Sequence, residues 1–374
     1  MRVILTGGGT AGHINPALAI AETILQNAPD SEVIFVGNKK GKEVDLVPRE
    51  GYQLYFTKSK GIPRKASKLS PKRLHAYWLA ATSPYMPRTT NIIKRFKPDL
   101  VIGTGGYACW PIMAAATRMG IPTAVHESNS FPGLAIRRLQ DEVNMIWINF
   151  PSTAERIRAH EKITKVGNPL RRGFGMISYE EAREKLGIAP DQKMILSFAG
   201  SLGAAPVSEA VLGMMRDYSS KDTRLLHVHA TGKDDYEDMK KLYASYGLQH
   251  CQNCTLTDYI YDMPLRMAAA DLVISRAGAM TLSELALMRK AAILIPSPNV
   301  AENHQYHNAK EFADAGAAIL TEEKTLGDGA LTDAARAILE DPARAADMKR
   351  AIAGFAVTDA NRRIWEKICE LTQK

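Results

Sequence analysis

The chain begins with an apolar run and a glycine-rich turn, MRVILTGGGTAGHINP, over residues 1–16. An apolar run that ends in closely spaced glycines and leads into a helical pattern is typical of a strand, a phosphate-binding turn and a helix. Gly7, Gly9 and Gly12 have the spacing of the dinucleotide-binding fingerprint. The first question is therefore whether this turn binds a nicotinamide dinucleotide or another phosphate.

The second predicted strand answers that question. A dinucleotide site needs an acidic residue at the end of this strand to bind the ribose hydroxyls. The run EVIFVG over residues 32–37 is instead followed by Asn38 and Lys39, and the nearby Asp30 and Glu32 precede its apolar core. We therefore reject a dinucleotide. The turn still offers free backbone N–H groups and a helix dipole to an anion, although a purely structural turn is the alternative interpretation.

Strand and helix patterns alternate along the rest of the chain. Helical spacing over residues 16–28 and 281–290, among others, separates short apolar runs and predicts crossover helices in parallel sheets. The length of 374 residues suits two such α/β domains. The predicted strands lie within residues 2–6, 32–37, 53–57, 100–105, 123–127, 145–150, 194–200, 225–231, 254–259, 272–278, 291–297 and 317–322.

The two domains are expected to meet in the stretch ITKVGNPLRRGFG, residues 163–175, because closely spaced glycine and proline residues interrupt both patterns there. We expect one domain over residues 1–165 and a second over residues 166–355. The tail over residues 356–374 has helical spacing and is expected to pack back on the first domain. Ligands of parallel sheets bind beyond the carboxyl ends of the strands, which places the site in a cleft between the domains.

Two further glycine loops follow predicted strands, GTGGY at residues 103–107 and AGSLGA at residues 199–204. Three such loops indicate a ligand with more than one phosphate, or two phosphorylated ligands. The stretch DLVISRAGAMTLSELA, residues 271–286, predicts a helix whose first N–H groups face a pyrophosphate. Glu284 in this helix can accept hydrogen bonds from ribose hydroxyls, or it is only a capping carboxylate.

Basic residues dominate the chain between Glu50 and Asp99, where no acidic residue occurs, and the net charge of the whole chain is +8. The segment also contains aromatic and aliphatic residues, among them Tyr77 and Trp78. Such a mixture suits an anionic membrane surface or single-stranded nucleic acid, or a solvated helix face over an apolar stripe. Its basic residues are Lys58, Lys60, Arg64, Lys65, Lys68, Lys72, Arg73, Arg88, Lys94, Arg95 and Lys97.

The cysteines predict a reducing compartment and no metal. The chain has four cysteines, too few and too scattered for a disulfide framework, and it shows neither a leader nor a membrane-spanning pattern. Cys251 and Cys254 form an isolated Cys-x-x-Cys pair that His227 or His229 could approach. A zinc site needs two further ligands, so we interpret the pair as incidental.

In order along the chain, eight motifs resemble those of the MurG family, the peripheral membrane N-acetylglucosaminyltransferases of peptidoglycan synthesis. The resemblance covers nearly the whole chain, and it implies a GT-B fold in which two Rossmann-like domains with parallel sheets face each other across a cleft. The motifs are GGGTAGHINPALAIAE, GTGGY, HESNSFPGLAIRRL, VGNPLR, GSLGA, DYIYDM, SRAGAMTLSELA and ENHQYHNA.

The resemblance also implies roles for individual residues. The Ile260 backbone would contact the uracil of UDP-N-acetylglucosamine, Glu284 the ribose, and Gln305 with Asn129 the sugar hydroxyls. The full set for this donor is Thr10, Ala11, Gly12, Asn129, Arg171, Ser201, Ile260, Ala279, Met280, Thr281, Leu282, Ser283, Glu284 and Gln305. The diphosphate of the acceptor would face Gly9, Gly105, Gly106 and Tyr107.

The implied reaction is an inverting transfer of N-acetylglucosamine to the C4 hydroxyl of N-acetylmuramic acid in undecaprenyl-diphosphate-linked lipid I, which gives lipid II. It requires a base, and His13 is the first candidate because the ordinary pKa of histidine, about 6.5, lies near working pH. Glu127 is the alternative base, or it orients another group. Helix N-termini with Arg171 or Arg276 can meet the charge of the leaving diphosphate, so no metal or other cofactor is required.

The same resemblance places the basic segment at the anionic cytoplasmic face of the cell membrane. The residues expected to dock there are Lys72, Arg73, Trp78, Leu79 and Tyr85. Nucleic acid binding would leave the donor motifs unexplained and is not expected. Two other functions stay open: a GT-B transferase that acts on a different lipid acceptor, and a non-catalytic protein that binds a UDP-sugar.

Overall fold

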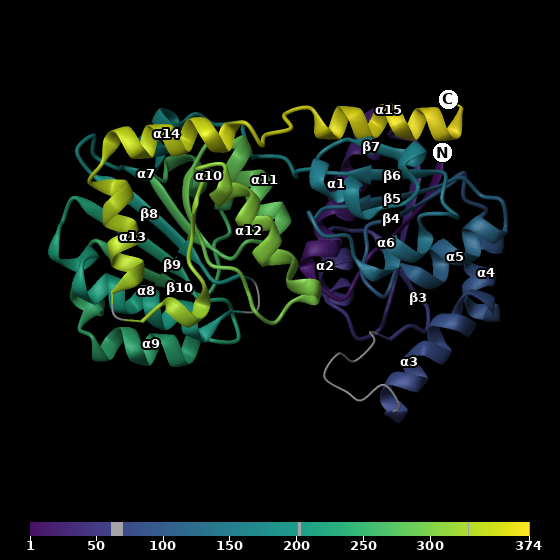
Figure 1. The fold of residues 1–374 in the computed structure, drawn as a ribbon, viewed down its shortest axis with the longest axis horizontal. Coiled ribbons are helices and arrows are strands. Elements are labelled where there is room, and N and C mark those ends of the chain that lie inside the picture. The colour runs from purple at the N-terminus through teal and green to yellow at the C-terminus, as the bar shows by residue number, and fades with distance from the viewer. Residues whose placement is uncertain (61–69, 201–202, 328, 374) are drawn as a thin grey trace. The chain divides into compact units, whose positions relative to one another are not determined.

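The computed structural model describes residues 1–60, 70–200, 203–327 and 329–373 (Figure 1). The chain forms two compact units, Met1–Arg171 with Asp359–Lys374, and Arg172–Thr358. The division at Arg171 falls within the stretch of residues 163–175 that we expected to separate two domains. Ser201 lies outside the described residues.

The first unit contains a seven-stranded sheet in the order β3-β2-β1-β4-β5-β6-β7, with every pairing parallel. Its central strands are continuous apolar runs because helices cover both faces of a parallel sheet. The strand order reverses between β1 and β4, and such a switch point is where parallel sheets bind ligands. The strands are β1 (Arg2–Thr6), β2 (Glu32–Gly37), β3 (Gln53–Phe56), β4 (Leu100–Gly103), β5 (Thr123–Glu127), β6 (Met145–Ile148) and β7 (Ile163–Lys165).

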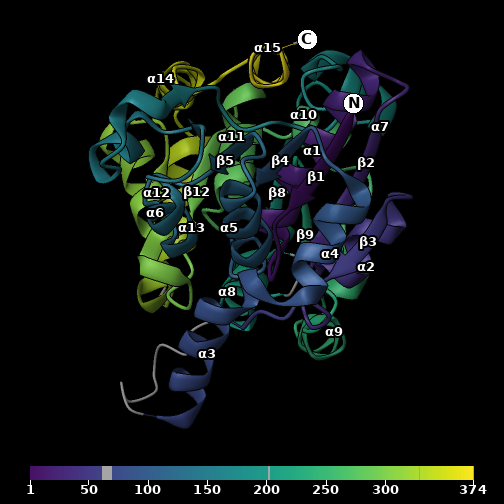
Figure 2. The ribbon, with the colours of Figure 1, turned by 90° about the vertical axis from the view of Figure 1, so that its right-hand side faces the viewer.

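Helices cover this sheet. Helix α1 begins at Ala11, directly after the glycine turn and earlier than its apolar pattern indicated, and it includes Pro16. Helix α3 extends away from the sheet of its unit (Figures 1 and 2). The helices of the unit are α1 (Ala11–Asn27), α2 (Glu43–Arg49), α3 (Pro71–Thr82), α4 (Pro87–Phe96), α5 (Trp110–Arg118), α6 (Leu134–Leu139) and α15 (Ala360–Thr372).

The second unit contains six parallel strands in the order β10-β9-β8-β11-β12-β13, with its own switch point between β8 and β11. The strands are β8 (Lys193–Phe198), β9 (Leu225–Ala230), β10 (Cys254–Thr257), β11 (Leu272–Ser275), β12 (Ala291–Leu294) and β13 (Ile319–Leu320). The helices are α7 (Tyr179–Leu186), α8 (Ala205–Asp217), α9 (Tyr236–Ser245), α10 (Met263–Ala269), α11 (Ala279–Leu287), α12 (His304–Asp314), α13 (Ala330–Leu339) and α14 (Pro342–Ala353).

The C-terminal helix α15 belongs to the core of the first unit. It packs against α1, at the edge of the unit where Figure 1 shows it, and its Ile364 and Ile368 are fully buried in the same apolar cluster as Ile14 and Trp147. The Asn361 side chain also accepts a hydrogen bond from the backbone N–H of residue 170 at 3.1 Å and donates to its carbonyl at 3.0 Å. The chain thus returns to its first unit after completing the second.

We expect replacement of Ile364 by alanine to lower the free energy of unfolding by about 2–5 kcal/mol, because it leaves a cavity between α15 and α1. Denaturant unfolding measures the loss. Glu366→Ala is the control, because Glu366 is exposed on the same helix, and it should change the free energy by less than about 0.5 kcal/mol. Equal values for the two variants would contradict the packing described for α15.

Candidate active site

The first two glycine loops meet at the carboxyl ends of β1 and β4. Thr6 pairs with Gly103 in the sheet, and the Thr104 N–H donates to the Thr6 carbonyl at 2.8 Å. A Cβ on Gly106 would lie 2.2 Å from the carbonyl oxygen of Gly8. The two loops therefore pack backbone against backbone, which only glycine permits at these positions.

His13 lies at this junction, on the first turn of α1. A Cβ on Gly105 would lie 2.9 Å from its Nδ1, so the imidazole fits directly over the second loop. Nδ1 is 3.2 Å from the Thr104 carbonyl oxygen, and the Thr104 hydroxyl donates to the His13 carbonyl at 2.6 Å. A proton on Nδ1 satisfies the Thr104 carbonyl and leaves Nε2 as the basic nitrogen.

Burial lowers the pKa of His13 below its ordinary value of 6.5, and the contact with the Thr104 backbone opposes part of that shift. The imidazole is therefore neutral at about pH 7. Among the described residues, no group hydrogen-bonds to its Nε2. His13 thus has the protonation state and the free nitrogen that a general base requires.

The start of α1 is open to an anion. Thr10 is the N-cap in an extended conformation, its side chain makes no capping hydrogen bond, and no acidic residue occupies the first turn. Gly12 is exposed and Ala11 is partly exposed. Unsatisfied N–H groups and the helix dipole at such an end favour a phosphate.

The predicted acceptor residues are also brought together here. The ring of Tyr107 packs against Gly9, where a Cβ would lie 2.9 Å from Cε1. Burial and the nearby Glu43 raise the pKa of Tyr107, so its hydroxyl stays protonated. The Gly9 N–H, however, donates to Glu43 at 2.8 Å. The Gly9 N–H is therefore not available to a ligand, and the Tyr107 ring fills the place of a side chain at this position.

Glu127, at the end of β5, organises its own loop. Its Oε1 accepts from the Asn129 backbone N–H and side-chain amide at 3.0 Å each, and its Oε2 accepts from the Gly133 N–H at 2.7 Å. Burial raises the pKa of Glu127, and these hydrogen bonds oppose the shift. A buried carboxylate with these partners is suited to positioning Asn129 rather than to accepting a substrate proton.

Arg171 ends the first unit and pairs with Glu50 at 2.8 Å, with its side chain 46% exposed. Exposed ion pairs contribute only about 0–1 kcal/mol, so an anionic ligand can compete for this guanidinium. Its expected approach to the phosphates of the donor stays a prediction.

The third glycine loop lies at the switch point of the second unit, between β8 and α8. Gly203, at φ +92°, packs against the loop after β9: a Cβ there would lie 2.3 Å from Oδ2 of Asp235. A Cβ on Gly232 would lie 2.3 Å from the Gly203 nitrogen. Helix α8 follows with no side-chain cap at Ala204 and no acidic residue in its first turn.

Helix α11 starts beside this loop, because β11 pairs with β8. Its N-cap Gly278 makes no side-chain capping bond, and its first turn contains no acidic residue, so Glu284 is not a first-turn capping carboxylate. Thr281, Ser283 and Glu284 are partly exposed. The buried residues at the start of the helix are Ala279, Met280 and the fully buried Leu282, whose side chain a ligand cannot reach.

Other predicted donor residues lie in loops of the second unit. Ile260 is 5% exposed in the loop after β10, which leaves its backbone as the group that could contact a base. Gln305 on α12 accepts a hydrogen bond from the Ser297 N–H at 2.9 Å and so holds the loop after β12.

Arg276 does not have the role that we considered for it. Its guanidinium donates to the carbonyls of residues 295 and 296 at 3.3 Å each, and it pairs with Glu323. The side chains of this ion pair are only 13% and 19% exposed. A guanidinium already neutralised inside the unit is poorly placed to meet a diphosphate.

His227 and His229, which could have approached the cysteine pair, have hydroxyl partners instead. His227 lies 2.9 Å from the hydroxyls of Ser197 and Ser219, and His229 lies 2.9 Å from Ser197 and 3.1 Å from Ser208. Each ring nitrogen thus has a hydroxyl partner, and burial lowers the pKa of His227 to about 3 and of His229 to about 4.

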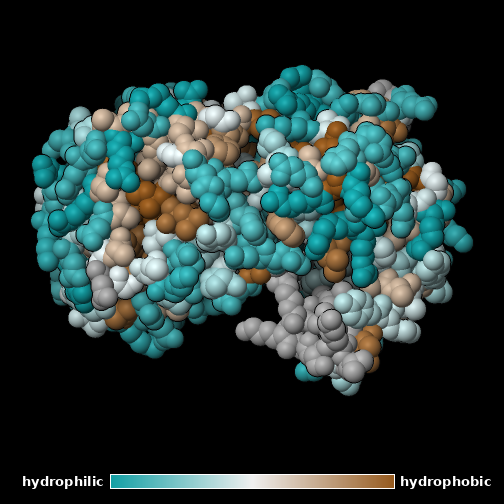
Figure 3. Space-filling model, in the orientation of Figure 1, coloured by the Kyte–Doolittle hydropathy of each residue, from teal (hydrophilic) through white to brown (hydrophobic). Residues whose placement is uncertain are grey.

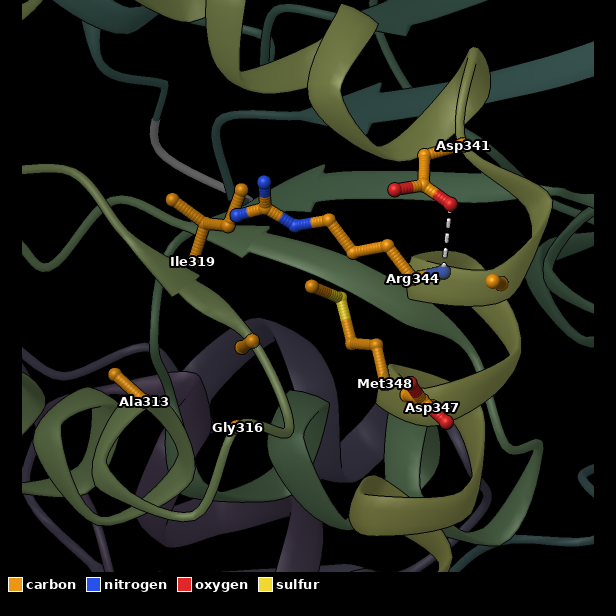
Figure 4. A pocket seen from close by; sticks show the side chains of 9 residues that line it. Ala313, Gly316, Ile319, Asp341, Arg344, Asp347 and Met348 are labelled. Atoms are coloured by element: carbon orange, nitrogen blue, oxygen red, sulfur yellow. Dashed lines mark hydrogen bonds between the residues drawn. The ribbon is translucent and has the colours of Figure 1, made fainter.

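The structure contains a cavity of about 490 Å³ between the end of α12, β13 and the start of α14 (Figure 4). Arg344, Asp347 and Met348 line it, together with small residues. None of the predicted site residues does. Among the described residues, no group of His, Cys, Asp and Glu side chains could hold a metal ion, and no helix is long and apolar enough to cross a membrane.

Two Rossmann-like units, each with glycine loops and uncapped helix starts at one sheet edge, define a protein of the GT-B class. Residues 3–147 match the glycosyltransferase family 28 N-terminal domain, and residues 194–364 match the family 28 C-terminal domain. The chain belongs to the MurG family of N-acetylglucosaminyltransferases, which its curated relatives and a similar solved structure identify.

Among these relatives is the UDP-N-acetylglucosamine--N-acetylmuramyl-(pentapeptide) pyrophosphoryl-undecaprenol N-acetylglucosamine transferase of Acetivibrio thermocellus, 40% identical over 99% of this chain and 98% of the relative. A transferase of the same name from Desulfitobacterium hafniense is 37% identical over 97% of each chain. The crystal structure of Acinetobacter baumannii MurG has a TM-score of 0.74 and 27% identity over 99% of both chains. Staphylococcus aureus MnaA with UDP shares the fold at 16% identity, with a TM-score of 0.68 over 100% of this chain and 97% of the other.

The environment of His13 predicts the acid side of the pH–rate profile. Because the pKa of His13 is lowered, the neutral base persists below pH 6.5, and kcat/KM should stay constant from about pH 7 down past 6.5 before it falls. His13→Gln should lower kcat by about 10²–10⁴-fold and abolish this acid limb. An acid limb centred above pH 6.5, or one that persists in the variant, would exclude His13 as the base.

Proposed function

We propose that the protein transfers N-acetylglucosamine from UDP-N-acetylglucosamine to the C4 hydroxyl of N-acetylmuramic acid in undecaprenyl-diphosphate-linked lipid I, and so produces lipid II. The observation that carries the proposal is a neutral His13 with a free Nε2 at the junction of two glycine loops. It occurs in a chain that is similar over 99% of its length to an enzyme named for this transfer.

On the acceptor side, Gly9, Gly105, Gly106 and Tyr107 face the diphosphate of the lipid. As the C4 oxygen attacks the anomeric carbon from the face opposite UDP, His13 takes its proton on Nε2. The bond from the anomeric carbon to UDP breaks as the new glycosidic bond forms, so the configuration inverts. The loss of UDP leaves the proton on the imidazole.

On the donor side, the Ile260 backbone contacts uracil and Glu284 accepts hydrogen bonds from the ribose. The backbone of residues 279–283 and Ser201 hold the diphosphate, and Gln305 contacts the sugar. The first-unit residues proposed to contribute are Thr10, Ala11, Gly12, Asn129 and Arg171. Helix N-termini stabilise the developing negative charge on UDP, so we propose that no metal is required.

We further propose that helix α3 and the following turn dock on the anionic cytoplasmic face of the cell membrane. Trp78 is 55% exposed, Tyr85 is 65% exposed with the Arg118 guanidinium over its ring at 3.9 Å, and Lys72 on the same helix as Trp78 is exposed. Leu79 was expected in this surface but is only 8% exposed; it packs inward and does not contribute. The side chain of Arg73 lies outside the described residues.

The proposed docking surface is confined to helix α3 and the turn that follows it. On the face drawn in Figure 3, hydrophobic residues form small separate areas among hydrophilic ones. Aromatic side chains with neighbouring cations are the combination that an interfacial segment needs, because cations attract anionic headgroups while the rings insert.

We expect purified protein with UDP-N-acetylglucosamine and a lipid I analogue to release UDP and form the disaccharide product at equal rates, and excess EDTA to leave both rates unchanged. Both should be measured with and without the analogue. Activity lost on EDTA addition and restored by a divalent cation would refute the metal-free mechanism. Donor binding without product, under conditions in which a MurG enzyme turns over, would favour a different lipid acceptor or a binding-only protein.

Replacement of Trp78 by serine should weaken binding to anionic vesicles by about fivefold to tenfold, because one large apolar side chain no longer enters the interface. Vesicle cosedimentation measures the change, and the affinity for UDP-N-acetylglucosamine should stay constant. Met176→Ser is the control, since Met176 is 81% exposed on the second unit. Unchanged vesicle binding by Trp78→Ser would reject this docking surface.

A further inference from the structure

A buried carboxylate that the proposed chemistry does not use lies beneath the first glycine loop. Glu43, the first residue of α2, is fully buried. Its Oε2 accepts a hydrogen bond from the Gly9 N–H, and its Oε1 accepts one from the Asn38 N–H, both at 2.8 Å. The carboxylate therefore joins the loop after β1 to the loop after β2.

Glycine residues make room for this carboxylate on three sides. A Cβ on Gly8 would lie 2.4 Å from Oε1, one on Gly37 would lie 2.6 Å from Cγ, and one on Gly41 would lie 2.0 Å from Oε2. These distances are shorter than any van der Waals contact, so no side chain fits at these positions while Glu43 keeps its place. Backbone from two strand ends and from the turn before α2 thus surrounds a single side chain.

The contact with Gly9 sets the geometry of the turn that precedes His13. Gly9 has a left-handed φ of +89°, with its N–H directed at Glu43 and its α-carbon against the ring of Tyr107. The next residue, Thr10, is the N-cap of α1. The position of the first turn of α1, and of the imidazole on it, therefore depends on where Glu43 holds Gly9.

We propose that Glu43 is a positioning residue for the transfer reaction: its carboxylate fixes Gly9 and thereby places the open start of α1 and the base His13. This inference rests on the proposed function, because the effect on catalysis is measured in the proposed transfer reaction. Two backbone N–H groups require two acceptor oxygens, which a carboxylate supplies. A glutamine of the same size supplies one, and its NH₂ group then faces another donor.

Glu43→Gln is the first test, and Asp45→Asn is its matched control. Asp45 lies on the same helix and is exposed, so the control makes the same change of charge without touching the loop. We expect Glu43→Gln to lower kcat by about tenfold or more at a temperature well below its unfolding midpoint, because a small displacement of a reacting group slows chemistry strongly. The dissociation constant for UDP-N-acetylglucosamine should also rise, because the carboxylate places the turn that carries Thr10, Ala11 and Gly12, which are proposed to contact the donor.

Hydrogen exchange gives a readout that does not depend on the acceptor. Overlapping peptides that isolate the amide of residue 9 should exchange faster in Glu43→Gln than in the wild type or in Asp45→Asn, because the Gly9 N–H has lost its acceptor. Gly41→Ala is a second way to break the contact between Glu43 and Gly9. The new Cβ at position 41 would displace Oε2 of Glu43, although the carboxylate itself is kept. This variant should reproduce both effects, and it tests the proposal if Glu43→Gln does not fold.

A lowered unfolding midpoint with an unchanged kcat in both variants would overturn the proposal and leave Glu43 a purely structural role. Unchanged exchange of the residue 9 amide would overturn it as well. Absence of lipid-linked product from the wild type would refute the proposed function alone, since the exchange comparison still tests the placement of Gly9 by Glu43.

Discussion

The candidate site depends on the close approach of two loops at the carboxyl ends of β1 and β4. Parallel pairing of these strands places the loops side by side, and the space between the Gly8 carbonyl and Gly106 excludes even a methyl group. Backbone contact at this distance brings the Thr104 carbonyl within reach of the His13 ring. A side chain at Gly106 would separate the loops and displace the carbonyl that orients the imidazole.

The helix starts at the two sheet edges are suited to anions. Helices α1, α8 and α11 each begin directly from a loop at the sheet edge, and none has a side-chain capping hydrogen bond or a first-turn acid, so the helix dipole at each start favours a negative charge. The arginine that could have competed for a diphosphate in the second unit, Arg276, is held by Glu323 instead. The proposed diphosphate contacts are therefore with backbone groups whose positions the sheets fix.

The fold could be predicted well from the sequence because parallel strands covered on both faces are continuous apolar runs. All twelve predicted strand ranges contain a strand, and their alternation with helices predicted the two parallel sheets. Strand β7 was missed because it is short and only partly buried. A stretch that contains glycine and proline follows it and resembles a linker. The position of the glycine loops at the ends of strands was also predictable, since it follows from a local order of strand, turn and helix.

The residues that sequence reasoning missed or misplaced are those whose surroundings depend on contacts with residues distant along the chain. Glu43 is separated from Gly9 by 34 residues, and nothing in its local sequence indicates that three glycines surround it. Leu79 has the composition of a membrane-docking residue, but the face of α3 on which it lies is set by tertiary packing. Arg276 lies next to the predicted pyrophosphate helix, yet its partner Glu323 is 47 residues away.

Free hydrogen-bonding capacity, rather than a shifted pKa, distinguishes His13, the proposed base, from the other buried histidines. Burial lowers the pKa of His126, His227 and His229 to between about 3 and about 4, and it lowers that of His13 as well. Both ring nitrogens of the first three have partners; those of His126 are the Gly167 carbonyl at 2.9 Å and the Ser128 hydroxyl at 3.3 Å. A neutral imidazole with two partners stabilises its surroundings, whereas His13 is oriented through Nδ1 alone. Its Nε2 is consequently the nitrogen on which a substrate proton can be received.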